Sequence, residues 1–269
     1  MSQNHKQKKE QSPFRHLRLA ILLLILAFLA TPHLRSSLDT IRQNPDQYEH
    51  HYSFGLTFPF VGSYYLMKPE NYDPAKQYPL VVALHGVSKH AYPAEALAQP
   101  DFRKKYPFFI MVPIAPGQAF WATPKNKNYQ MDQGALPWPD HLPLVISGIE
   151  GIASQYNINK SKIIITGHSM GASGVIGALE RYPDYFSGGI GSSGVWDPNQ
   201  ISNIRTPLFI FHGTQDAAVP VHYATALKEA ARNKGRLIRV HILENRGHEI
   251  GSVIYKSPQV WDNLIAALK

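Results

Sequence analysis

The residues of this chain that could do covalent chemistry centre on one serine, in Gly167-His-Ser-Met-Gly171. A G-x-S-x-G sequence places its serine on a sharp turn between a strand and a helix, so that the hydroxyl stands free above a sheet. The pattern alone is common. Here an isoleucine-rich segment precedes it and small residues follow it, as a strand and a closely packed helix require. We therefore expect Ser169 to be a nucleophile, the other interpretation being a plain strand–helix turn.

A serine hydroxyl becomes a good nucleophile only when a neighbouring base takes its proton. In the chain order serine, acid, histidine, the downstream candidates are Asp216 and His248, each on a loop directly after an expected strand. Ligands of open α/β sheets bind at these carboxyl ends of strands. Asp197 is the rival acid, while His222 and His241 fall within an expected helix and strand. The structural interpretation makes Asp216 a turn or helix-cap residue and His248 a solvated loop residue.

Two N–H groups should stabilise the oxyanion that forms when a serine attacks a carbonyl. The first candidate is the amide of Met170, directly after the nucleophile. The second is the amide of Val87, in the loop after the first expected parallel strand, where Gly86 allows the turn. We expect the His85 side chain to tie this loop down by hydrogen bonds, because the backbone does the catalytic work there.

The elements that must position these groups follow an α/β pattern. Short apolar runs alternate with helical patterns, which predicts βαβ units and a mostly parallel, doubly wound sheet. We expect an opening pair of strands in 54–67, then strands at 78–84, 108–113, 162–166, 186–191, 207–211 and 237–243, and helices over 141–156, from 169 onward and over 257–268. The connection between Gly191 and Pro207 is too short for a cap domain.

A pocket for the substrate is harder to locate from sequence. The tryptophans Trp121, Trp138 and Trp196 could line an acyl or aryl pocket, and packing in the core is the other interpretation. The first two lie in a long loop, 115–140, rich in glycine, proline and aromatic residues. The histidines do not suggest a metal ligand set, so we expect no metal and no cofactor.

Composition limits the classes of function. The chain has 269 residues and a formal net charge of +8, with 44% hydrophobic residues and no cysteine. This length suits one α/β domain with a full core. Half of the charge excess lies within residues 1–18, and the rest forms no basic run, so we expect no nucleic-acid partner. The absence of cysteine excludes disulfides and a thiolate nucleophile.

The N-terminus has the pattern of an export signal. A basic stretch ends at Arg18, and residues 19–30 are apolar throughout. Such a run is short for a membrane span but typical of a secretory signal. No clear A-x-A site precedes Ala30, so cleavage and retention as a membrane anchor both stay open. We expect a signal peptide or anchor over 1–30, a tether over 31–47 and one catalytic domain over 48–269, in the periplasm or outside the cell.

Several longer segments resemble a known family. Residues 65–86, 156–171 and 182–186, together with His212-Gly-Thr-Gln-Asp216 and Val219-Pro220, are similar to phospholipase/carboxylesterase and polyhydroxybutyrate-depolymerase-like esterases of the α/β-hydrolase superfamily. The resemblance implies an α/β-hydrolase fold, a Ser169/Asp216/His248 triad and ester hydrolysis. The chain departs from the family in two places: Gly86-Val-Ser-Lys89 lacks a second glycine, and Ala172 stands where a third glycine often follows the serine.

We therefore expect a carboxylesterase without a cap domain, acting through an acyl-enzyme on small-molecule or polymer-attached esters. A serine peptidase of related fold is one alternative. A non-catalytic, hydrolase-derived binding protein of the cell envelope is another, although such proteins usually lose a member of the triad, and here all three residues are present.

Overall fold

The computed structural model describes residues 48–54, 61–115, 120–130, 140–235 and 237–268. The chain divides into two units, Met1–Arg35 and Ser36–Lys269, and every described residue belongs to the second. The expected signal segment, the tether and Trp138 lie outside the described residues. Among the residues that are described, we find no helix with the length and apolar character that crossing a membrane demands.

The core of the domain is one eight-stranded sheet with the strand order β1-β2-β4-β3-β5-β6-β7-β8. Strand β2 runs antiparallel to both of its neighbours, and all other pairs are parallel. The mostly parallel sheet expected from the sequence is confirmed. The strands are β1 (Glu49–Phe54), β2 (Val61–Met67), β3 (Tyr78–Leu84), β4 (Phe109–Ile114), β5 (Ile158–His168), β6 (Gly188–Ser192), β7 (Leu208–Gly213) and β8 (Ile238–Leu243).

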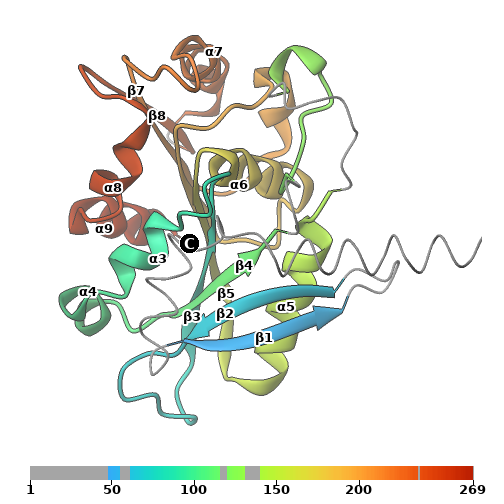
Figure 1. The fold of residues 1–269 in the computed structure, drawn as a ribbon, viewed down its shortest axis with the longest axis vertical. Coiled ribbons are helices and arrows are strands. Elements are labelled where there is room, and N and C mark those ends of the chain that lie inside the picture. The colour runs from blue at the N-terminus through green and yellow to red at the C-terminus, as the bar shows by residue number, and fades with distance from the viewer. Residues whose placement is uncertain (1–47, 55–60, 116–119, 131–139, 236, 269) are drawn as a thin grey trace, which may run out of the picture. The chain divides into compact units, whose positions relative to one another are not determined.

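Helices cover both faces of this sheet, as a doubly wound fold requires (Figure 1). Along β3, Leu80 and Val82 belong to one buried cluster, and Val81 and Ala83 belong to the other. This alternation follows from the two-residue period of a strand. The first cluster packs beneath α5 (Leu142–Gln155), α6 (Met170–Arg181) and α7 (His222–Ala230), and the second beneath α3 (Tyr92–Leu97), α8 (Gly251–Ile254) and α9 (Pro258–Ala267).

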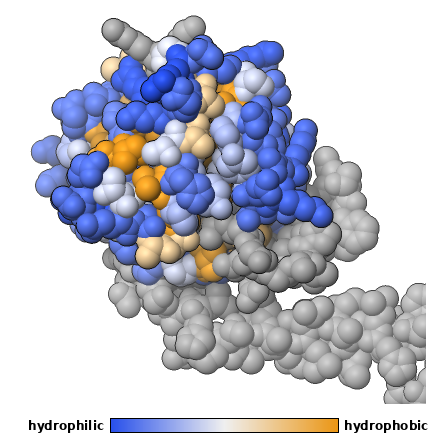
Figure 2. Space-filling view, turned by 90° about the horizontal axis from the view of Figure 1, so that it is seen from above, coloured by the Kyte–Doolittle hydropathy of each residue, from blue (hydrophilic) through white to orange (hydrophobic). Residues whose placement is uncertain are grey.

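Burial does not extend to every large apolar side chain. Val87, Val253 and Ile265 are exposed among the described residues. On the face shown in Figure 2, hydrophobic side chains gather into a patch with hydrophilic ones around it. Such partial exposure is usual for a folded domain.

The structure adds elements that the sequence pattern did not reveal. Helix α3 and helix α4 (Pro100–Lys105) follow β3, each only six residues long with proline in the first turn. Neither is long enough to show a helical period. Strand β5 also begins four residues earlier than expected, because Ile158 pairs with Tyr78. The polar residues 159–161 follow this pair, and the register shifts before the next pair, Leu80 with Ile163.

The segments that connect the strands determine where the site lies. Between β6 and β7, residues 193–207 contain one short 3-10 helix, η3 (Pro198–Asn203), so the expected lack of a cap domain at this point is confirmed. The other 3-10 helices of the described residues are η2 (Lys127–Tyr129), η4 (Ala231–Lys234) and η5 (His248–Ile250). The carboxyl ends of β3, β5, β6, β7 and β8 meet at one edge of the sheet, where the expected site residues follow them.

Candidate active site

Ser169 is the single residue between β5, which ends at His168, and α6, which begins at Met170. Its φ of +56° is in the left-handed region, which L-residues adopt at a cost. The turn is so tight that a Cβ on Gly167 would lie 2.5 Å from the carbonyl carbon of Gly171. A Cβ on Gly171 would lie 2.2 Å from the Leu84 oxygen. Both glycines of the motif are therefore required by the close approach of backbone to backbone.

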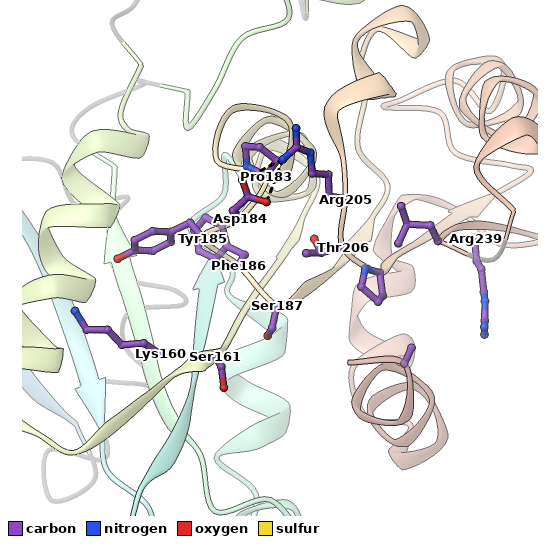
Figure 3. A pocket seen from close by; sticks show the side chains of 13 residues that line it. Lys160, Ser161, Pro183, Asp184, Tyr185, Phe186, Ser187, Arg205, Thr206 and Arg239 are labelled. Carbon is purple, nitrogen blue, oxygen red and sulfur yellow. Dashed lines mark hydrogen bonds and ion pairs between the residues drawn. The ribbon is translucent and has the colours of Figure 1, made fainter. Parts of the chain in front are cut away.

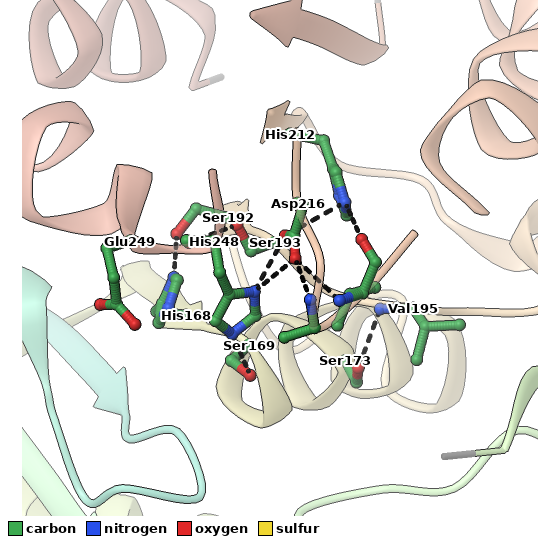
Figure 4. Close-up of polar contacts among 12 residues, drawn as sticks. His168, Ser169, Ser173, Ser192, Ser193, Val195, His212, Asp216, His248 and Glu249 are labelled. Atoms are coloured by element: carbon green, nitrogen blue, oxygen red, sulfur yellow. Dashed lines mark hydrogen bonds and ion pairs between the residues drawn. The ribbon is translucent and has the colours of Figure 1, made fainter. Parts of the chain in front are cut away.

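The structure brings Ser169, His248 and Asp216 together in the expected order (Figure 4). His248 Nε2 lies 3.0 Å from Ser169 Oγ. On the other side of the ring, His248 Nδ1 lies 2.9 Å and 3.0 Å from the two Asp216 carboxylate oxygens. Because a carboxylate only accepts, His248 donates through Nδ1, which leaves Nε2 able to accept the Ser169 proton. The arrangement can therefore convert a serine hydroxyl into a nucleophile.

Asp216 is held as a carboxylate. Its side chain is fully buried, and the backbone amides of Ala218 and Val219 donate to its Oδ1 at 3.0 Å and 2.7 Å. Burial would raise the pKa of Asp216, but the hydrogen bonds from His248 and the Val219 amide outweigh it and hold that pKa below its ordinary value. His212, whose Nε2 lies 3.4 Å from the same carboxylate, donates to the Val219 oxygen at 2.8 Å.

The rival residues are placed elsewhere. Asp197 precedes η3 and accepts hydrogen bonds from the Asn199 amide at 3.0 Å and the Gln200 side chain at 2.9 Å. His222 begins α7 and is exposed, while His241 lies on β8 and stacks on a phenylalanine. Within the described part of the chain, no three His, Cys, Asp or Glu side chains are grouped as metal ligands.

The loop expected to supply an oxyanion-hole amide lies against the serine turn. A Cβ on Gly86 would lie 3.5 Å from the Ser169 Cβ and 3.4 Å from the His168 oxygen. Among the described residues, neither the Met170 amide nor the Val87 amide has a hydrogen-bond acceptor. Both N–H groups are thus available, and their role in binding an oxyanion stays a prediction.

His85 anchors this loop, as expected. Its Nδ1 donates to the Gly86 oxygen at 2.7 Å, and its Nε2 accepts from the Ala115 amide at 3.1 Å. Burial and the charge of Lys89 lower the pKa of His85 to about 3, so the ring is neutral. Lys89 adopts a φ of +64° in this loop, which lacks a second glycine, and its Nζ donates to the Ala115 oxygen at 2.9 Å.

His168 is a neighbour of the site that sequence reasoning missed. Its ring centroid lies 4.9 Å from that of His248, and its Nδ1 lies 2.9 Å from Ser192 Oγ. Burial and the nearby His248 charge lower the pKa of His168 to about 4. The sequence indicated His168 only by its position directly before the nucleophile. The tight turn at this position brings each of its residues close to the ends of neighbouring strands.

The described tryptophans pack in the core. Trp121 and Trp196 are 2% and 0% exposed. Trp121 lies against Gly174, Trp196 lies against Gly177, and the Trp121 indole donates to the His85 oxygen at 2.9 Å. Side chains buried to this degree contribute to packing under α6 and to the anchoring of the loop at His85.

One cavity of about 580 Å³ lies at the opposite edge of the sheet (Figure 3). Residues at the amino ends of β5, β6, β7 and β8 line it, among them Lys160, Ser187 and Arg205. Its charged groups do not converge: Lys160 pairs with Glu150 at 2.7 Å, and Arg205 pairs with Asp184 at 3.2 Å. The cavity therefore forms no part of the site around Ser169.

Comparison with known proteins gives a family and a fold. The family model Esterase, described as "Putative esterase", matches residues 63–249. A solved thermostable esterase is similar with a TM-score of 0.71 and 25% identity, over 83% of this chain and 64% of that one. No curated protein matches the chain.

Two further solved structures are more distant in sequence. A ferulic acid esterase from Anaeromyces mucronatus in complex with ferulic acid has a TM-score of 0.58 and 14% identity, over 82% of this chain and 90% of that one. An acylaminoacyl peptidase from Pyrococcus horikoshii has a TM-score of 0.61 and 15% identity, over 86% of this chain and 44% of that one. These similarities agree with the observed sheet and establish the α/β-hydrolase fold. The chain spans only 64% of the length of the thermostable esterase.

Proposed function

The chain belongs to the Esterase family, whose model covers residues 63–249, and we propose that it is a serine carboxylesterase with Ser169, His248 and Asp216 as its catalytic triad. The observation that carries this proposal is the continuous pair of hydrogen bonds from Asp216 through His248 to Ser169 Oγ. A buried carboxylate, an oriented imidazole and a half-buried serine on a tight turn are the parts that acyl transfer needs.

Acylation begins when Ser169 Oγ attacks the ester carbonyl carbon while His248 Nε2 takes the hydroxyl proton. The carbonyl oxygen becomes an oxyanion, which the amides of Met170 and Val87 stabilise. As the tetrahedral intermediate collapses, the ester C–O bond breaks and His248 gives its proton to the leaving alcohol. Asp216 stabilises the imidazolium through both steps.

Deacylation repeats these steps with water. His248 takes a proton from a water molecule that attacks the acyl-enzyme carbonyl, and the same two amides hold the second oxyanion. Collapse breaks the bond to Ser169 Oγ, which regains the proton from His248 as the carboxylic acid leaves. Apart from water, these steps use only groups of the protein, so we propose that the enzyme works without a cofactor.

The short connection between β6 and β7 supports a proposal for the substrate class. Only η3 lies between β6 and β7, so bulky groups attached to the acyl or alcohol part meet no cap there. We therefore propose esters that are bulky or attached to a polymer, such as acyl or feruloyl groups on polysaccharide. The similarity in fold to a ferulic acid esterase supports this class.

Turnover of p-nitrophenyl esters of increasing acyl length tests the proposal, with the full-length wild type beside Ser169→Ala. We expect wild-type turnover to fall by at least about a thousandfold in the variant, since removal of the nucleophile leaves only binding and oxyanion stabilisation. The same acyl groups presented as anilides measure the preference for esters over amides. Equal turnover by both proteins, or faster anilide than ester hydrolysis, would contradict an esterase with this nucleophile.

We also propose export from the cytoplasm, on the basic stretch and the apolar run 19–30. N-terminal sequencing of protein recovered from the envelope of a bacterial host tests this. A new N-terminus near residue 31 indicates cleavage, an intact one in the membrane fraction indicates an anchor, and recovery from the cytoplasm alone contradicts export.

A further inference from the structure

The carboxyl end of β6 lies beside the loop that carries His248. Ser193, directly after β6, is buried, and its Oγ donates to the His248 backbone oxygen at 2.8 Å. The Ser193 amide donates to the Phe211 oxygen on β7 at 2.9 Å. Ser193 thus links the ends of two neighbouring strands, β6 and β7, to the histidine that contacts Ser169 (Figure 4).

Ser193 makes this contact from an unfavourable backbone conformation. Its φ is +55°, in the left-handed region where the Cβ of an L-residue is crowded and where glycine carries no such penalty. Backbone of this kind persists when the surrounding structure holds it, and it concentrates at functional sites. Glycine would suit this φ better, and what serine adds here is the hydroxyl on the His248 oxygen.

The His248 loop depends on contacts of this kind. It leaves β8 through Asn245, itself at a φ of +56°, and on its other side it packs so closely on β7 that a Cβ on Gly213 would lie 2.1 Å from the Arg246 oxygen. The Gly213 contact limits the approach of the loop to the sheet. The Ser193 hydroxyl adds a contact to the backbone of His248 itself.

We propose that Ser193 is a positioning residue for the reaction: its hydroxyl holds the His248 backbone so that Nε2 meets Ser169 Oγ and Nδ1 meets Asp216. A displacement of the imidazole by a fraction of an ångström misaligns the hydrogen bonds of the triad and slows proton transfer. This inference rests on the proposed function and adds a residue that touches neither the substrate nor the reacting atoms.

Two substitutions separate positioning from a purely structural role. Ser193→Gly removes the hydroxyl and relieves the backbone, whereas Ser193→Ala removes the hydroxyl and keeps the crowded Cβ. We expect kcat to fall about tenfold in both variants with KM nearly unchanged, because ester binding does not involve Ser193. We expect the melting temperature of Ser193→Gly to exceed that of Ser193→Ala, so that activity and stability change independently.

Asn71→Gly is the matched control. Asn71 has a φ of +54° in the turn before β3, at the edge of the sheet away from the triad. Removal of the unfavourable backbone conformation in that turn by glycine should leave kcat unchanged. Full wild-type kcat in Ser193→Gly, or kcat that follows melting temperature across the Gly and Ala variants, would overturn the inference. Wild-type turnover that Ser169→Ala abolishes keeps the proposed function intact in either case, so the two failures are distinguishable.

Discussion

At the scale of single residues, the activity of the site depends on which hydrogen-bond partner each polar atom has. Asp216 accepts from His248 Nδ1 and from two backbone amides, which leaves the carboxylate no freedom to rotate away. We predict that Asp216→Asn lowers kcat by about 10³- to 10⁴-fold, because an amide can donate to the ring and favour the tautomer that cannot accept the Ser169 proton. Ester turnover at saturating substrate measures this effect.

Asp197→Asn serves as its control. Asp197 is also an acid after a strand of the sheet, but it accepts from Asn199 and Gln200 within its own turn. Its substitution should leave kcat within about twofold of wild type, since the triad does not include it. Comparable losses in the two variants would show that the structure assigns the wrong acid.

The sequence was informative about residues that a chain-order rule connects. Ser169, Asp216 and His248 each follow an expected strand, and the structure brings them within hydrogen-bond distance. Ser193 and His168 follow no such rule. Their contacts with the His248 region depend on which strands lie side by side and on a backbone φ, and neither can be read from residue types along one chain.

At the scale of elements, the serine turn depends on the fit between β3, β5 and α6. A Cβ on Gly171 would lie 2.2 Å from the Leu84 oxygen, a contact between backbones that no rotamer change can relieve. We predict that Gly171→Ala destabilises the fold by about 3 kcal/mol, at the upper end of overpacking costs, and abolishes turnover. Urea unfolding followed by circular dichroism measures the change in free energy.

Gly151→Ala in α5 is the matched comparison. A Cβ there would meet only the Tyr64 hydroxyl, at 3.9 Å, so the helical propensity of alanine should stabilise the fold by about 0.5–1 kcal/mol. If both substitutions had the same small effect, the close packing of the serine turn would not exist as described.

Elements were predictable where the pattern is long or strongly apolar. Strand β3 has the expected bounds, and the ends of β4, β6, β7 and β8 differ from the expected ends by at most two residues. Helices α3 and α4 were not predicted, because six residues with an early proline show no period. The position of β2 between β1 and β4 is likewise a property of the whole sheet.

At the scale of the whole molecule, buried histidines link stability to pH. Burial lowers the pKa of His85 to about 3 and that of His168 to about 4, and it lowers the pKa of His212 as well. In the unfolded chain a histidine binds its proton below about pH 6.5. Between pH 6.5 and 5 the unfolded state therefore binds more protons than the folded state, and stability is lost as pH falls.

We predict a decrease in unfolding free energy of about 1.4 kcal/mol per pH unit for each of His85 and His168 as pH approaches 5. Urea titrations at half-unit steps from pH 7.5 to 5 measure the slope. The variant His168→Asn should reduce this slope by the contribution of about one proton, because one buried imidazole is removed. A flat profile over this range would show that these rings are protonated in the fold.

The proposed activity requires that Ser169 is a nucleophile activated by His248 and Asp216. Intact mass and peptide mapping after a short reaction with a fluorophosphonate, which forms a covalent bond to activated serines, test it most directly. We expect one adduct per wild-type chain, located on the Ser169 peptide, a much slower adduct in Asp216→Asn and none in Ser169→Ala. An unlabelled wild type, or an adduct that persists at another residue in Ser169→Ala, would contradict it.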